Sequence, residues 1–504
     1  MKGYYNLKHI IIGLAFLYLI RIKNPEQLKH HSPGELGKLI GLDRIPEAKT
    51  LRKKIYQISR QRQAKAWSRE LAKKWVAEEK NHFYYIDGHV KVYSGHKANL
   101  GKKHISRLKL CLPGMTEFWV NNAKGLPYFV VTGEVNEKLQ EIMLTKIIPE
   151  LIENVAMKIS DEQLAADKDL PRFTLVFDRE AYSPKFFRQL WEQYRIAVIT
   201  YRKNVKDLWD EKNFTKQSYE KDGNIETMEI AEKNITLDGF EFREVRKKNT
   251  DRHQTSIVTT NKKLHTKSIA ISMFARWTQE NFFKYSRENY DMDRIAYYIV
   301  NEIDNDTTVV NPIYSKLTYK IKKVKEKINR RKLKLYELVK ENVQTELDAK
   351  TSKNIKKQGE LEEQVQILKA EHQELVEERK QHPYHIKVKD MEEDIRYNKL
   401  DWESKLFLNI IKIICYRAET SIALLLSTDY QKKFDEMRAL TRSLINTKAN
   451  IIPDYQNKTL TIELYSLSNP RDNQAVKSIL NVLNDSETVF PGTDLKLIYK
   501  FGTL

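Results

Sequence analysis

Strand and helix patterns alternate through the middle of the chain. Residues 82–93 are rich in strand formers, and apolar residues between 137 and 159 recur at the spacing of one helical face. An apolar run over residues 173–177 predicts a buried strand ending at Asp178, and residues 196–201 predict the next strand. Strands that alternate with helices in this way are typical of an α/β fold.

The first 80 residues show helical periodicity instead. Ser32, followed by Pro33 and Glu35, predicts the start of one short helix, and Thr50 predicts the start of a second. The basic side of the second helix includes Arg52, Lys53 and Lys54. Two short helices with a tight connector and a basic second helix suggest a helix-turn-helix. An ordinary amphipathic hairpin with a solvated charged face explains the same pattern at least as well.

The second half of the chain carries a charged helical segment. Residues 202–265 are polar with short strand signals and predict a β-rich insertion, after which the pattern is helical again. Residues 315–382 predict a helical hairpin that turns between 345 and 359, and its part between Lys316 and Lys334 holds ten Lys or Arg and one acid. The remaining predicted elements are an apolar helix at 391–427 and a strand, helix and strand at 459–465, 473–484 and 495–501.

The charge balance favours a polyanionic partner. With 88 Lys and Arg against 68 Asp and Glu, the 504-residue chain has a formal net charge of +20, which makes nucleic acid a candidate partner and simple solubility the alternative. The longest apolar run, residues 10–20, is shorter than the roughly 18–20 residues of a spanning helix and predicts a buried helix. Two distant cysteines, Cys111 and Cys415, exclude a disulfide framework and favour a reducing compartment.

Several catalytic motifs are excluded. Residues 95–103 resemble a phosphate-binding loop, but the spacing is one residue too long and no Ser or Thr follows the lysine. The chain has no Gly-x-Ser-x-Gly elbow, no His-Glu-x-x-His and no Cys-x-x-Cys. Candidate chemistry therefore rests on acidic residues.

Two aspartates stand at the ends of apolar strands. Asp87 follows residues 83–86, and Asp178 follows residues 175–177. Each needs an explanation, because an unpaired buried carboxylate is costly. A turn at Asp87 and a helix cap at Asp178 are one explanation. The other is a divalent metal, because hard cations such as Mg²⁺ prefer carboxylate oxygens and act in pairs on phosphodiesters.

A third acid lies in a helical pattern further along the chain. Arg276, Glu280, Lys284 and Arg287 are spaced 4, 4 and 3 residues apart, so they share one helical face. A ladder of surface ion pairs is one explanation of this face. The other is a carboxylate flanked by cations that hold DNA phosphates.

With these three segments in order, the chain resembles a bacterial insertion-sequence transposase of the DDE superfamily. Residues 85–90 are similar to the strand with the first catalytic Asp, residues 176–183 to the segment with the second, and residues 276–283 to the helix with the catalytic Glu. One branch has a Tyr-x2-Arg-x3-Glu-x6-Lys signature. The positions matching it are Met273, Arg276, Glu280 and Arg287, so Met replaces Tyr and Arg replaces Lys.

The resemblance implies a ribonuclease H-like α/β core. In that core Asp87, Asp178 and Glu280 would be catalytic and would bind Mg²⁺ or Mn²⁺, and the β-rich insertion would correspond to residues 202–265. The implied activity is cleavage of double-stranded DNA at transposon ends and joining of the freed 3′-hydroxyl to target DNA. The candidate DNA-binding residues are Arg276, Lys284, Arg287, Arg52, Lys53 and Lys54.

We expect four structural units and a DNA partner. The units are a helix-turn-helix-like domain at 1–80, the catalytic domain at 81–310, the charged hairpin with its apolar helix at 315–430, and a small α+β unit at 431–504. We also expect a homodimer when two element ends are brought together, and a cytoplasmic, nucleoid-associated location without a membrane partner. Two alternatives stay open: a transposase-derived DNA-binding protein that no longer cuts, and a coiled-coil architectural protein.

Overall fold

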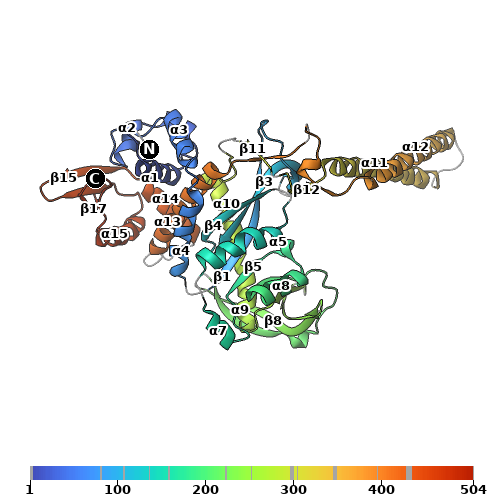
Figure 1. Ribbon diagram of the computed structural model, residues 1–504, viewed down its shortest axis with the longest axis horizontal. Coiled ribbons are helices and arrows are strands. Elements are labelled where there is room, and N and C mark those ends of the chain that lie inside the picture. The colour runs from blue at the N-terminus through green and yellow to red at the C-terminus, as the bar shows by residue number, and fades with distance from the viewer. Residues whose placement is uncertain are drawn as a thin grey trace.

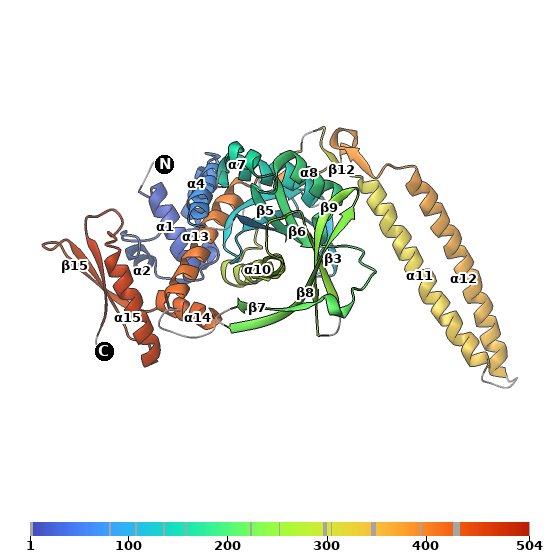
Figure 2. The same cartoon turned by 90° about the horizontal axis from the view of Figure 1, so that it is seen from below.

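The protein is a mixed α/β molecule with a large central sheet. In the computed structural model, helices pack on both faces of this sheet and a long helical arm extends from one end (Figure 1). The N-terminal helices and the C-terminal unit lie at the end opposite the arm in both views (Figures 1 and 2). The structure describes residues 4–79, 82–105, 108–134, 137–156, 159–221, 224–250, 253–295, 300–303, 305–343, 349–393, 396–426 and 434–502.

The N-terminal segment is helical, as its periodicity predicts. Its elements are α1 (Leu7–Leu19), the 3-10 helix η1 (Pro25–His30), α2 (Pro33–Lys38), α3 (Ala48–Ser59) and α4 (Ala64–Ala77). The apolar run forms α1, where Ile10, Leu14 and Leu17 are buried. In the part of the chain that the structure describes, no helix is long and apolar enough to cross a membrane.

The predicted pair of short helices is partly correct. Ser32 caps α2, and its hydroxyl accepts a hydrogen bond from the Glu35 amide. The prediction that Thr50 starts the second helix is wrong, because α3 already begins at Ala48. Residues 39–47 connect the two helices, which is longer than the three- or four-residue turn of a helix-turn-helix. The tight connector is therefore absent, and the helix-turn-helix remains a prediction.

The central sheet combines parallel and antiparallel strands. Its order is β2-β3-β1-β5-β6-β10-β9-β8-β7, with β4 paired to β3. β1 runs parallel to β5, and β5 runs parallel to β6, whereas β3 and β10 are antiparallel to β1 and β6. The strand bounds are β1 (Phe83–Val92), β2 (Lys102–Ile105), β3 (Leu110–Asn121), β4 (Pro127–Glu134), β5 (Phe173–Phe177), β6 (Ile196–Tyr201), β7 (Thr215–Lys221), β8 (Asn224–Leu237), β9 (Phe240–Lys248) and β10 (Gln254–Thr259).

Side chains of the central strands alternate between two helical layers. Ile86 and Phe177 belong to a core with α8, whereas Tyr85 and Val176 belong to a second core with α9 on the other face. The helices concerned are the segment of α- and π-turns α5 (Leu139–Ile142), η2 (Met143–Ile147), α6 (Ile148–Glu150) and η3 (Leu151–Val155), then α7 (Asp161–Ala166), η4 (Arg179–Ala181), α8 (Pro184–Tyr194), α9 (Thr266–Ala275) and α10 (Trp277–Tyr290). The α/β prediction is confirmed, and the strands of the insertion extend the same sheet through β10.

The predicted helical hairpin forms the arm. It consists of α11 (Pro312–Val343) and α12 (Ala349–Lys380), which pack side by side through Val324, Ile328 and Val365 (Figure 2). The range predicted for the turn, 345–359, extends into α12, which begins at Ala349. The connection between the two helices lies outside the described residues. Short strands β11 (Val300–Glu302), β12 (Thr308–Val310), β13 (His385–Lys387) and β14 (Asn398–Leu400), with η6 (Val388–Asp390), form the base of the arm.

The C-terminal part returns to the body of the protein. The predicted helix at 391–427 is shorter than expected, because α13 spans Glu403–Leu426. α13 shares one hydrophobic core with α1, α3 and α10, so the N-terminal helices do not pack alone. The remaining elements are α14 (Phe434–Ile445), β15 (Ala449–Asp454), β16 (Thr459–Leu464), α15 (Pro470–Asp485) and β17 (Lys496–Phe501), of which α14 and β15 were not predicted.

Candidate active site

Asp87 and Asp178 lie side by side on the neighbouring parallel strands β1 and β5, at the point where β5 ends. Ile86 of β1 pairs with Phe177, the last residue of β5. Asp87 is the next residue of β1, and Asp178 is the first residue after β5. Alternation directs both side chains to the face that α9 covers. β1 continues through Asp87 to Val92, so Asp87 is not in a turn. Asp178 does act as a helix cap, but only of the 3-10 turn η4. Its carboxylate accepts a hydrogen bond from the Arg179 amide at 2.7 Å.

Glu280 reaches the aspartates from the first turn of α10. The helical segment breaks at Arg276, which ends α9 and precedes α10. The Gln279 side chain is fully buried and donates to the main-chain carbonyls of Tyr85 at 3.1 Å and Trp119 at 3.2 Å. Through these bonds, α10 is held against the strand that carries Asp87.

The chain also makes room for this close approach. Gly125, in the turn between β3 and β4, has φ +76°, and a Cβ there would lie 2.7 Å from the main-chain oxygen of Thr278. Thr278 in turn donates to the carbonyl of Ala123 at 3.3 Å. A glycine at this turn therefore permits the β3–β4 turn to contact the start of α10.

The Arg276 guanidinium lies among the three carboxylates. Nη2 is 3.2 Å from Oε1 of Glu280 and 3.8 Å from Oδ2 of Asp178, and Nη1 is 3.7 Å from Oδ2 of Asp87. The arginine side chain is 8% exposed, whereas those of Asp87, Asp178 and Glu280 are 23%, 46% and 41% exposed. The cation is thus buried beneath Asp178 and Glu280, which are exposed to solvent, and beside Asp87, which is more buried than they are.

The electrostatics of the cluster are unbalanced. Burial raises the pKa of Asp87 to about 7; the Arg276 guanidinium opposes this rise, and the carboxylates of Asp178 and Glu280 add to it. Tyr201, on β6, belongs to the same surroundings: burial raises the pKa of its hydroxyl, with Arg276 opposing. Three carboxylates against one guanidinium leave a net negative site, which is the environment that a divalent cation stabilises.

The three acids are side chains of a type that binds metal ions, but they are not arranged to bind one in this structure. Three carboxylates are the ligands of a hard cation such as Mg²⁺. Nevertheless, no group of three or more His, Cys, Asp or Glu side chains is arranged to hold a metal ion in the described part of the chain. The guanidinium of Arg276 lies within 4 Å of an oxygen of each of the three carboxylates.

The predicted DNA-binding residues differ in how exposed they are. Lys284 and Arg287 are exposed on α10, beyond Glu280, whereas Arg276 is buried and directed to the acids. Lys53 is exposed, and Arg52 is half exposed with an ion pair to Glu26 at 3.0 Å. Lys54 is buried. The expectation of a surface role for Lys54 is therefore not met, because its position on α3 faces the core beside Leu51 and Ile55.

A cluster of polar residues fixes the far end of α10. Glu419, on α13, accepts hydrogen bonds from Tyr285 and Tyr290 of α10 and forms an ion pair with Arg21 at 2.7 Å. We refer to Arg21, Tyr285, Tyr290 and Glu419 as the Glu419 cluster. It joins the helix of Glu280 to segments from both ends of the chain, which the sequence did not indicate.

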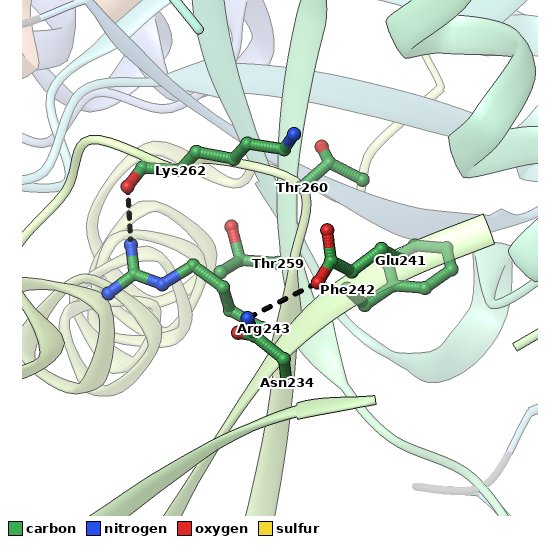
Figure 3. Close-up of a pocket in the computed structure, with 7 residues that line it drawn as sticks. All are labelled: Asn234, Glu241, Phe242, Arg243, Thr259, Thr260 and Lys262. Carbon is green, nitrogen blue, oxygen red and sulfur yellow. Dashed lines mark hydrogen bonds between the residues drawn. The ribbon is translucent and has the colours of Figure 1, made fainter. Parts of the chain in front are cut away.

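A hollow of about 280 Å³ lies away from the acids, against β8 and β9. Its lining residues come from the insertion and from the segment after β10 (Figure 3). Arg243 lines the hollow. Its guanidinium already donates hydrogen bonds to the carbonyls of Asn261, Lys262 and Leu264, and it forms an ion pair with Glu232. Because these donors are used internally, we do not assign a ligand to this hollow.

Gln279 and Tyr201 were missed by sequence reasoning. Gln279 directly precedes Glu280, and a buried amide within a polar helix carries no local signal of its partners. Tyr201 is the last residue of β6, the strand next to β5, and its side chain lies on the same face of the sheet as that of Asp178. Only knowledge of the strand order would have identified it.

The site and fold together define a class of protein: a mixed α/β molecule in which two neighbouring parallel strands and one helix bring three carboxylates to one guanidinium. The chain matches a family model described as "Transposase protein" over residues 1–503, and it belongs to that family. No curated protein and no solved structure shows significant similarity to it.

Proposed function

We propose that this member of the transposase family is a DDE-type enzyme with a ribonuclease H-like core. Asp87, Asp178 and Glu280 are its catalytic acids. The observation that supports this most directly is convergence: the three acids are 91 and 102 residues apart in the chain, yet each lies within 4 Å of the same guanidinium. A surface ion-pair ladder along α10 requires no contact with either aspartate.

The proposed reaction is cleavage of double-stranded DNA at the element ends and transfer of the 3′-hydroxyl to target DNA. The three acids hold Mg²⁺ or Mn²⁺, which when bound supplies Lewis-acid stabilisation of the phosphate charge. Lys284 and Arg287 hold the DNA backbone beside Glu280, since exposed cations on this helix suit phosphate contacts. Gln279 keeps the acid-bearing helix in register with β1.

The arm contributes a second DNA-binding surface in this proposal. Between Lys316 and Lys334, α11 carries ten cationic side chains and one acid, and most of these cations are exposed. A basic helix of this kind binds phosphates without reading bases. The enzyme acts as a homodimer that holds two element ends.

Replacement of each acid by alanine tests the proposal. Asp87→Ala, Asp178→Ala and Glu280→Ala should each remove most cleavage and strand transfer of a plasmid that carries the DNA flanking the gene. The losses should not add in double variants, because the acids act as a unit. DNA binding should persist or tighten, since a negative charge near phosphates is removed.

Glu288→Ala is the matched control, because this exposed acid lies on α10 away from the cluster. If Glu280→Ala cuts like the parent in Mg²⁺, the catalytic assignment is wrong and the α10 face is an ion-pair ladder. If the parent binds the end DNA but cuts it with neither Mg²⁺ nor Mn²⁺, the alternative of a transposase-derived DNA-binding protein replaces the proposal.

A further inference from the structure

The place of Arg276 differs from that of an ordinary DNA-binding arginine. Its side chain is 8% exposed and its guanidinium faces inward, toward Asp87, Asp178 and Glu280. Two of the three ion pairs, at 3.7 and 3.8 Å, are longer than a hydrogen bond, and the Nε atom is buried without a hydrogen-bond partner. The contact is therefore an electrostatic bridge rather than a set of saturated hydrogen bonds.

A divalent ion and this guanidinium compete for the same oxygens. Mg²⁺ needs its ligands at about 2.1 Å, so carboxylates that share it must approach one another closely. The guanidinium already lies within 4 Å of one oxygen of each carboxylate, so it occupies the position that an ion shared by all three would need. For this reason the acids cannot all ligate one ion until Arg276 has withdrawn.

The surroundings of Arg276 permit that withdrawal. The residue lies at the break between α9 and α10. The next side chain, Trp277, is 57% exposed, and its ring centre lies 5.9 Å from Cζ of Arg276. An outward-turned guanidinium therefore has an exposed aromatic ring beside it.

We propose that Arg276 is an exchangeable placeholder cation: it bridges the three acids while the site holds no metal, and it exchanges them for a DNA phosphate when a divalent ion binds. The inference rests on the proposed function of the acids. The exchange makes metal and DNA binding mutually reinforcing, because each ligand favours the same withdrawn position of the arginine. It also keeps the acids together before DNA arrives, since the bridge offsets their mutual repulsion.

Manganese binding to the full chain without DNA tests the competition. Titration calorimetry should show roughly tenfold tighter Mn²⁺ binding for Arg276→Gln than for the parent, because the competing cation is gone. The control Arg287→Gln also removes one positive charge, but from an exposed side chain on α10 rather than from the guanidinium among the acids. It should bind Mn²⁺ like the parent. Arg276→Gln should also gain more thermal stability from Mn²⁺ than the parent does.

Duplex binding in the presence of Ca²⁺ tests the exchange. Fluorescence anisotropy with a short labelled duplex should show a several-fold gain in affinity on adding Ca²⁺ to the parent. Arg287→Gln should bind more weakly throughout but keep that gain, whereas Arg276→Gln should lose most of it. Equal Mn²⁺ affinity of Arg276→Gln and the parent, or a full Ca²⁺ gain in Arg276→Gln, overturns the placeholder role alone. Absence of Mn²⁺ binding to both the parent and Arg276→Gln, with and without duplex, overturns the metal-dependent function itself.

Discussion

The side-chain amide of Gln279 donates to the main-chain oxygen of Tyr85 at 3.1 Å. Tyr85 precedes Asp87 on the same strand by two residues, and Gln279 directly precedes Glu280. The same amide also donates to Trp119, on the strand at the other side of Asp87 from β5. This buried side chain therefore links the helix of Glu280 to the strand of Asp87 and to the neighbouring strand.

Gln279→Leu should separate the acids while the fold persists. The change removes both bonds and leaves two carbonyls without their donor, so we expect a loss of about 1–3 kcal/mol in the free energy of unfolding. Cleavage should fall much more than duplex affinity. Urea unfolding and a plasmid cleavage assay measure the two effects. Gln189→Leu, which removes a surface bond to Gln193 on α8, is the control and should leave both unchanged. Parent-like cleavage by Gln279→Leu would exclude the positioning role.

The Glu419 cluster should behave as one unit. Glu419 is 1% exposed and Arg21 is 16% exposed, so loss of either partner leaves a poorly solvated charge. Arg21→Gln and Glu419→Gln should each lower the free energy of unfolding by on the order of 3 kcal/mol, and the double variant by clearly less than the sum. A double-mutant cycle in urea measures this coupling. Strictly additive losses would show that the two residues act independently.

The ion pair between Arg69 and Glu150 should make stability depend on acid pH. Burial alone would raise the pKa of Glu150, but hydrogen bonds from Arg69 outweigh it and the pKa is lowered. A depressed folded-state pKa gives stability that is fully present above the unfolded value of about 4.3 and is lost as pH falls through the folded value.

Arg69→Gln should consequently lower the free energy of unfolding by about 1–3 kcal/mol at neutral pH. The difference from the parent should shrink as the pH falls below about 4. Urea unfolding across this pH range measures it. Lys73→Gln, whose partner Glu70 is exposed, is the control and should show little effect at any pH. A difference that is constant with pH would rule out the ion pair as its cause.

The arm should contribute salt-dependent, sequence-independent DNA affinity. Exchange of Lys320, Lys322 and Lys327 for Gln on α11 should weaken all duplexes alike and reduce the slope of log affinity against log salt by about 3. The matched control exchanges Lys356, Lys357 and Lys369 on α12, which carries seven glutamates between Glu360 and Glu378, and should change the slope less. Equal slopes for both triple variants would contradict a DNA surface on α11.

Local patterns were sufficient to predict most elements of the core. The strands at 83–92, 173–177 and 196–201 agree with the apolar runs of the sequence. Such patterns indicate which side of a helix or strand is buried. They can be read from residues that are close together in the sequence. They failed where a boundary depends on distant packing: α3 starts before Thr50, and α13 begins only at Glu403.

The sequence by itself determined the charge, the two aspartates that follow apolar runs and a helical face carrying Arg276 and Glu280. Only the tertiary structure decided which strands are neighbours, so that Asp87 meets Asp178 across a parallel pair. It also turned Arg276 inward and buried Lys54, against the expectation that both face DNA. The physical reason is that periodicity describes one element at a time. The direction of a long cationic side chain depends on the carboxylates and apolar groups that other elements bring to it.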